Sequence, residues 1–197
     1  MKEKDVYEEL SSIRDLMERS SKFISLSGIS GILAGVYALA GAGWGYTRIK
    51  NHSGSEQEIL WLLVSIALAV MILSLVTGYW FSMRKAKNRK ESVWNPVSRR
   101  LLTAVSYPMF TGAFFIGIML SKGEYTIIAA ASLLFYGLAL IAGSQYTFDD
   151  IKWLGICEIL LGLFALILPE HGLLVWAIGF GLLHIVYGSV MHFKYER

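Results

Sequence analysis

The chain has 197 residues, of which 55% are hydrophobic and only 17% are charged. Soluble domains of this size carry about 25% charged residues, so this composition is typical of a chain that lies mostly in lipid. No stretch of the 197 residues is long and polar enough for a second domain, which excludes a separate soluble catalytic or nucleic-acid-binding domain within them. The single cysteine, Cys157, excludes a disulfide framework and a cysteine-pair metal site.

The first 22 residues are polar and are expected to form an amphipathic helix. Val6, Leu10, Ile13 and Met17 follow a spacing that places them on one face of a helix. The other faces carry mixed charges, whereas a membrane-surface anchor is basic on its polar face. We therefore expect residues 1–22 to lie on the cytoplasmic side, packed against the bundle or a second copy. Docking of a cytoplasmic partner is the alternative.

Six apolar segments follow, each long enough, or nearly so, to cross a bilayer as a helix, which takes about 20 residues. They are Phe23–Tyr46, Ile59–Met83, Leu101–Ser121, Thr126–Thr147, Ile151–Pro169 and Leu173–His192. The sequence therefore predicts an all-α, polytopic membrane protein whose single domain, residues 23–197, holds six transmembrane helices as three antiparallel hairpins. The first segment is expected to be retained, because the residues before it are too long and too acidic for a signal peptide.

The basic residues predict the orientation. If the N-terminus is cytoplasmic, all 18 basic residues except Arg48, Lys50 and Lys122 fall on the cytoplasmic side. This asymmetry follows the positive-inside rule. Both termini are therefore predicted to be cytoplasmic, in a protein of the cytoplasmic membrane.

A basic loop over residues 84–100 is the largest predicted cytoplasmic feature. Its basic residues are Arg84, Lys85, Lys87, Arg89, Lys90, Arg99 and Arg100. Each can gain about 1 kcal/mol from anionic lipid headgroups, which we expect to be their partners. The run is too short for a nucleic-acid recognition fold, so nucleic acid is not an expected partner. Further along, Asp149 and Asp150 are expected to cap the start of the fifth helix.

Glu158 is the outstanding candidate for a functional residue, because it lies well inside an apolar segment. An ionisable residue within a transmembrane helix is a functional-site hypothesis whose partner should be named. Glu158 precedes Pro169 by 11 residues, and His184 follows Gly172 by 12. At about 1.5 Å per residue, both side chains lie roughly 17 Å from the same turn. We therefore expect Glu158 and His184 to meet.

Small residues share the helix faces of both side chains, which predicts that both point into protein rather than lipid. These are Gly155, Gly162 and Ala165 beside Glu158, and Ala177, Gly181 and Gly188 beside His184.

Two interpretations of this pair remain open. The first is structural: a Glu158–His184 hydrogen bond, or a neutral Glu158 bonded to Tyr136 or a serine, locks the bundle. The second is functional: Glu158, His184 and Tyr136 bind a proton or a substrate, since a carboxylate beside a histidine can exchange a proton near neutral pH. No cofactor is expected, although His184 alone could hold a haem. No metal site is predicted, because no two histidines share a helix face at ligand spacing.

A short sequence motif recurs in the first, third and fifth apolar segments. Gly162-Leu163-Phe164-Ala165-Leu166 in the fifth is similar to the runs that begin at Gly35 and Gly112, and the sixth segment contains Tyr187-Gly188. An internal duplication fits this similarity. From Ile156 to Gly188 the chain resembles the HdeD-like acid-resistance membrane proteins, a family of similar length with six helices in three hairpins. The resemblance implies an inner-membrane protein linked to stress and offers no catalytic residues.

Three functions follow as hypotheses. The first is a non-enzymatic, stress- or pH-related membrane protein with Glu158 and His184 as its polar core. A second copy of the chain is a candidate partner for it. The second is a small proton-coupled transporter or channel that uses this pair. The third is an intramembrane enzyme or a binder of lipid or quinone. The sequence favours a protein that is not an enzyme.

Overall fold

The computed structural model describes residues 27–51, 55–88 and 92–195, and within them it contains helices and no strand. The prediction of an all-α protein is confirmed for this part of the chain. The elements are α2 (Gly28–Asn51), α3 (Glu56–Asn88), α4 (Pro96–Lys122), α5 (Ile128–Ser144), α6 (Asp150–Ile167), the 3₁₀-helix η1 (Pro169–His171), α7 (Gly172–Trp176), the π-helix η2 (Ala177–Leu183) and α8 (His184–Tyr195). The predicted amphipathic helix over residues 1–22 lies outside the described residues.

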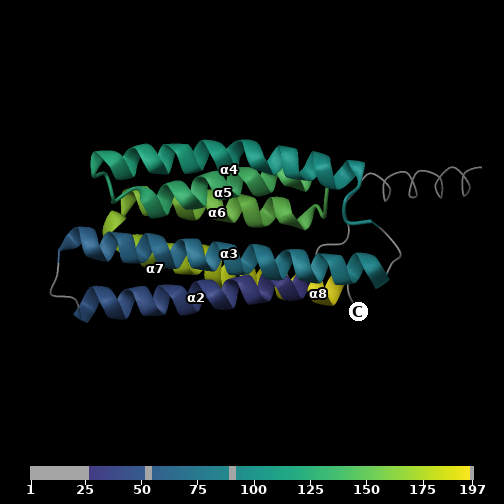
Figure 1. The fold of residues 1–197 in the computed structure, drawn as a ribbon, viewed down its shortest axis with the longest axis horizontal. Coiled ribbons are helices and arrows are strands. Elements are labelled where there is room, and N and C mark those ends of the chain that lie inside the picture. Colours follow the sequence, from purple (N-terminus) through teal and green to yellow (C-terminus); the bar gives the residue numbers. More distant parts are fainter. Residues whose placement is uncertain (1–26, 52–54, 89–91, 196–197) are drawn as a thin grey trace, which may run out of the picture.

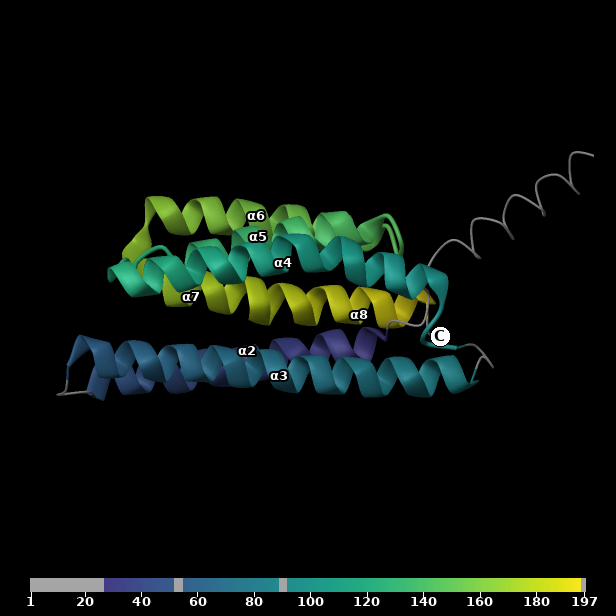
Figure 2. The same ribbon diagram turned by 45° about the horizontal axis from the view of Figure 1, so that its top comes forward.

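The helices lie side by side along one long direction (Figure 1). In the turned view, α7 and α8 form one continuous rod between two groups of helices, with α2 and α3 on one side and α4, α5 and α6 on the other (Figure 2). The rod packs mainly against α2, whereas α6 packs mainly against α5. The two helices that bear Glu158 and His184 therefore belong to opposite halves of the bundle.

Four helical stretches of the described residues are long and apolar enough to cross a membrane: Gly28–Asn51, Gln57–Asn88, Pro96–Lys122 and Pro169–Tyr195. Helix α5 is also apolar but shorter, with 17 residues. These lengths are compatible with a membrane protein, since roughly 17–25 residues span the hydrocarbon core of a bilayer.

The segment 84–100 is shorter as a loop than expected. Helix α3 continues to Asn88, and α4 already begins at Pro96. Asn95 caps α4: its side chain accepts a hydrogen bond from the Ser98 backbone, and the Ser98 hydroxyl accepts one from the Asn95 backbone. This reciprocal capping, with proline at the first helical position, lets a helix start among polar residues. The apolar pattern predicted shorter helices, ending at Met83 and starting at Leu101, because the polar turns at the end of α3 and the start of α4 are not apolar.

Glycines bring two pairs of helices close together. A methyl group added at Gly137 of α5 would lie 2.6 Å from the carbonyl oxygen of Gly155 of α6, and one added at Gly188 of α8 would lie 2.6 Å from that of Gly28 of α2. Only a residue without a side chain allows backbones to approach so closely. The α5–α6 contact holds Glu158 against the bundle interior, and the α2–α8 contact does the same for His184.

Candidate functional site

Glu158 and His184 are both buried and lie beside each other. The Glu158 side chain is 0% exposed, and that of His184 is 8% exposed. Nδ1 of His184 lies 3.5 Å from Oε1 of Glu158. The predicted meeting of these two side chains is therefore confirmed. It arises because α6 and the rod of α7, η2 and α8 run back from one short connection at Pro169–His171.

The two nitrogens of His184 make hydrogen bonds to other groups. Nδ1 lies 3.0 Å from the carbonyl oxygen of Gly179, and Nε2 lies 2.7 Å from the hydroxyl oxygen of Tyr136. A carbonyl oxygen can only accept, so Nδ1 carries the proton in this arrangement. In a neutral imidazole, Nε2 is then an acceptor, and the Tyr136 hydroxyl donates to it. Tyr136, one of the sequence candidates, is thus placed at the site through His184.

Neither carboxylate oxygen of Glu158 has a hydrogen-bond partner among the described residues. Oε2 instead faces the backbone of Gly179, where an added methyl group would lie only 2.5 Å away. Buried carboxyl groups are normally hydrogen-bonded, because removing them from water without compensation is costly. The Glu158 carboxyl group can therefore still accept or donate hydrogen bonds. The N–H group of His184 lies close to it, with Nδ1 3.5 Å from Oε1.

A π-helix precedes His184, and the apolar pattern of the sequence does not predict it. Segment η2 spans Ala177–Leu183, and within it the Gly179 carbonyl accepts a hydrogen bond from the side-chain Nδ1 of His184. Gly179 faces Glu158, whereas Gly181 approaches Leu39 of α2. Short π-helical segments occur frequently at functional sites.

The prediction that His184 points into protein is confirmed, since its side chain is buried. On its predicted small-residue face, Gly181 and Gly188 are buried and pack against α2, whereas Ala177 is half-buried. The face predicted for Glu158 is buried as expected, with Gly155, Gly162 and Ala165 all inside.

Aromatic rings enclose the histidine. The Phe180 ring stacks on that of His184 with a centroid separation of 6.0 Å, and it lies 5.0 Å from the Tyr136 ring. Trp176 lies 5.1 Å from Phe180 on the side of α7. These rings limit the rotation of the imidazole and shield it from solvent.

A polar cluster lies at the far end of α8. Nζ of Lys194 donates to both carboxylate oxygens of Asp150, at 3.0 and 2.9 Å, and the Tyr195 hydroxyl donates to Oδ2 at 2.7 Å. Partial burial alone would raise the pKa of Asp150, but these hydrogen bonds and the ammonium charge hold it below its ordinary value. Asp149 occupies the N-cap position without a side-chain capping bond, so the two aspartates do not both act as the predicted caps.

The basic residues proposed for lipid contact lie at the end of α3 and the start of α4. Arg84 lies over the Trp80 ring at 5.9 Å, and Arg99 lies over the Trp94 ring at 5.2 Å. Lys85 lies 5.8 Å from the centre of the Phe148 ring. Lys87 and Arg100 are exposed. Arg89 and Lys90 lie outside the described residues.

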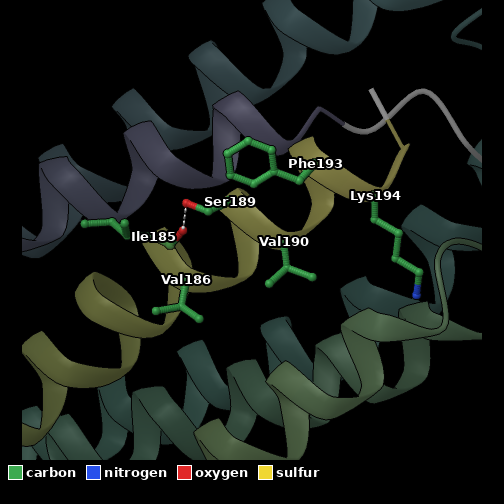
Figure 3. Close-up of a pocket in the computed structure, with 6 residues that line it drawn as sticks. All are labelled: Ile185, Val186, Ser189, Val190, Phe193 and Lys194. Atoms are coloured by element: carbon green, nitrogen blue, oxygen red, sulfur yellow. Dashed lines mark hydrogen bonds between the residues drawn. The ribbon is translucent and has the colours of Figure 1, made fainter. Parts of the chain in front are cut away.

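A shallow groove of about 600 Å³ runs along one side of α8 (Figure 3). It is lined by Ile185, Val186, Ser189, Val190, Phe193 and Lys194. The hydroxyl of Ser189 donates to the carbonyl of Ile185, and Lys194 is paired with Asp150. The lining is otherwise apolar and includes none of Glu158, His184 and Tyr136, so this groove is separate from the polar site.

The described residues contain no group of three or more histidine, cysteine or acidic side chains able to hold a metal ion. Comparisons with protein-family models, with curated proteins and with solved structures found no match for this chain. The geometry of the site is therefore the basis on which a function is proposed.

Proposed function

We propose that this protein is a non-enzymatic, polytopic membrane protein that responds to pH by binding a proton at Glu158, with His184 and Tyr136 as partners. One observation carries the proposal: the Glu158 carboxylate is fully buried and has no hydrogen-bond partner in the part of the chain that the structure describes, beside an Nδ1–H that can reach it by a small movement. A purely structural pair gains stability from a formed hydrogen bond, and an unpaired buried charge loses it. An uncommitted carboxylate is instead suited to change its protonation state.

The proposal includes a membrane topology. Six helices would cross the bilayer as three antiparallel hairpins, with both termini on the cytoplasmic side. The four long apolar stretches support this arrangement, and α5 and α6, with 17 and 18 residues, are at the lower end of spanning lengths. The excess of basic residues on one side supports the orientation.

The resemblance of residues 156–188 to the HdeD-like acid-resistance proteins agrees with a role in stress and pH response. In the same proposal, the basic residues from Arg84 to Arg100 contact anionic lipid headgroups of the cytoplasmic leaflet. Trp80 and Trp94, which lie under Arg84 and Arg99, suit this position because indole rings favour the headgroup region. Association with a second copy is also compatible with the exposed apolar faces of α3 and α4.

Infrared spectroscopy of the purified protein in lipid nanodiscs tests the proposal. A protonated carboxyl group has a carbonyl band of its own, and we expect one such band to appear and disappear with pH. Glu158→Gln should abolish this band, whereas Glu170→Gln should leave it, because the Glu170 side chain is 63% exposed. A wild-type spectrum in which no buried carboxyl titrates between about pH 4 and pH 9 would contradict the proposal.

A proton-coupled transporter is the second candidate, and the same buried carboxylate and histidine favour it. It differs in one measurable property, which is net proton flux across the membrane. Liposomes that contain the wild-type protein should then dissipate an imposed pH gradient, and Glu158→Gln should not. Wild-type protein that titrates at Glu158 without flux would leave the pH-responsive function and exclude transport.

A further inference from the structure

We infer that the buried site exchanges its proton with one aqueous phase only, at the end of the bundle where Asp150 lies, and that Tyr187 relays the proton. This inference rests on the proposed proton binding at Glu158 and adds the route and the side of access. Tyrosine hydroxyl groups lie on one side of the site, and a cluster of apolar residues closes the other.

Two tyrosine hydroxyl groups, those of Tyr187 and Tyr195, lie on one face of α8 together with His184 and Met191. His184, Tyr187, Met191 and Tyr195 are separated by three, four and four residues, which places them on a common helical stripe. His184 and Met191 are both buried, so this stripe faces the bundle interior. It leads from the Glu158 site to the cluster of Asp150, Lys194 and Tyr195.

Tyr187 occupies the middle of this stripe with an unused hydroxyl group. Its hydroxyl oxygen is buried and has no hydrogen-bond partner among the described residues. Tyr187 follows His184 by three residues and precedes Tyr195 by eight on the same helix, so it lies between the two ends of the route along α8. A buried hydroxyl normally finds a partner when its ring is packed inside. Here the hydroxyl keeps its capacity to donate and to accept a hydrogen bond during proton transfer.

The Asp150 end of the route reaches solvent. The Lys194 side chain is 53% exposed and that of Asp150 is 28% exposed. The Tyr195 hydroxyl, which donates to Asp150, is the first group of the stripe that can exchange with this surface. A carboxylate at a protein surface can collect protons from solution and pass them to a hydrogen-bonded neighbour.

The opposite side of the site is sealed by apolar residues. Ala130, Leu133, Ala165 and Val175 form the buried core, and Leu161 and Phe180 pack against it. Ala165 follows Glu158 by seven residues and Val175 precedes His184 by nine, so this cluster lies between the site and the connection at η1. None of these side chains can carry a proton, which makes exchange toward η1 unfavourable.

The ionisable side chains around the route come from three helices. Glu158 faces His184 of α8, and Tyr136 of α5 contacts the other side of that histidine. Tyr187 interacts electrostatically with Tyr136 of α5 and with Asp150 at the start of α6. Helix α2 approaches α8 through glycines, chiefly Gly28, Gly31 and Gly35. The protonation of Glu158 therefore depends on His184, Tyr136, Tyr187 and the Asp150 cluster.

The transfer balances as a relay. Because the Tyr187 hydroxyl has no partner within hydrogen-bonding distance among the described residues, water carries a proton to it from the Asp150 end and carries its own proton on to the Tyr136 hydroxyl. Tyr136 then passes its proton to Nε2 of His184. The resulting imidazolium gives the proton on Nδ1 to Oε1 of Glu158. Each hydroxyl gains one proton and loses one, the histidine changes tautomer, and Glu158 becomes a neutral acid. Release follows the same steps in reverse.

A rapid pH jump on the full chain in lipid nanodiscs, followed by the Glu158 infrared band, tests the relay. We expect Tyr187→Phe to slow the appearance of the band at least 10-fold and to leave its equilibrium midpoint unchanged, because the ring keeps its packing. Tyr107→Phe is the matched control, since Tyr107 on α4 is 70% exposed, and it should react at the wild-type rate. An unchanged rate in Tyr187→Phe would overturn the relay.

The side of access is tested with the wild-type protein alone, which keeps the inference falsifiable if Tyr187→Phe does not fold. In liposomes whose interior is strongly buffered, only the outer solution is acidified. The fraction of molecules whose band responds should equal the fraction whose C-terminal tag is cut by added protease, since α8 ends beside Asp150. A response from all molecules, or from the complementary fraction, would overturn one-sided access. Absence of any titrating band would instead contradict the proposed function itself.

Discussion

The Tyr136 hydroxyl lies 2.7 Å from Nε2 of His184, and this hydrogen bond joins α5 to α8 beside the buried carboxylate of Glu158. This hydrogen bond engages Nε2, whereas Nδ1 is the nitrogen of His184 that lies near Glu158. Nδ1, which bonds to the Gly179 carbonyl, is thereby kept protonated and within reach of the carboxylate. The tautomer of His184 is set by two neighbours from different elements.

Tyr136→Phe should destabilise the protein by about 1–3 kcal/mol, because it leaves the buried Nε2 of His184 without a donor. Chemical unfolding in detergent, followed by circular dichroism, measures the change. Tyr107→Phe, on the exposed face of α4, serves as the control and should change stability by less than about 0.5 kcal/mol. Equal stabilities for the two variants would show that the Tyr136 bond makes no net contribution.

Gly179→Ala should destabilise the protein by about 1–3 kcal/mol through overpacking. The new methyl group would lie 2.5 Å from Oε2 of Glu158 and 2.5 Å from Cδ2 of Leu133, both of which belong to buried residues. Gly117→Ala in α4 is the control, since nothing lies within 4 Å of its added methyl group. The control should be neutral or slightly stabilising, because alanine favours a helix over glycine. Thermal melting of both variants decides the matter, and a stabilised Gly179→Ala would refute the close contact.

Gly188→Ala should separate α2 from α8. Its methyl group would meet backbone atoms, the nitrogen of Ile32 at 2.5 Å and the carbonyl oxygen of Gly28 at 2.6 Å, and backbone cannot rotate aside as a side chain can. We expect a lower melting temperature and faster amide hydrogen exchange in both helices. Gly78→Ala in α3, whose added methyl group has nothing within 4 Å, should show neither effect. Unchanged exchange in Gly188→Ala would count against the α2–α8 contact.

The Asp150 cluster predicts a pH dependence of stability. The folded-state pKa of Asp150 lies below its ordinary value of 3.8, so the unfolded chain binds a proton first as pH falls. The stabilisation by this carboxylate is therefore present above about pH 4 and is lost as pH falls through the lower folded-state pKa. Melting temperatures of the wild type and Asp150→Asn between about pH 6 and pH 3 should converge at the acid end. A difference that widens on acidification would contradict the sign of this shift.

Much of the architecture follows from composition alone. A chain with so few charges and such long apolar runs forms helices because a helix satisfies its own backbone hydrogen bonds without water. Counting residues from Pro169 and Gly172 also predicted that Glu158 and His184 would meet, because helical rise is nearly constant. The predicted loop 84–100 was too long, because α3 ends at Asn88 and α4 begins at Pro96. Apolar runs mark the residues that lie in a core or in lipid, whereas the polar turns at the helix ends are marked by capping residues.

The helical class, the apolar segments and the shared depth of Glu158 and His184 can be predicted from the sequence, because they depend on local composition and a fixed rise per residue. The hydrogen bonds at the site depend on tertiary packing. Nδ1 of His184 bonds to the carbonyl oxygen of Gly179 in the π-helical segment Ala177–Leu183, and Nε2 bonds to the hydroxyl of Tyr136 on α5. Among the described residues Glu158 has no hydrogen-bond partner, and this depends on how separate helices pack, which no local pattern specifies.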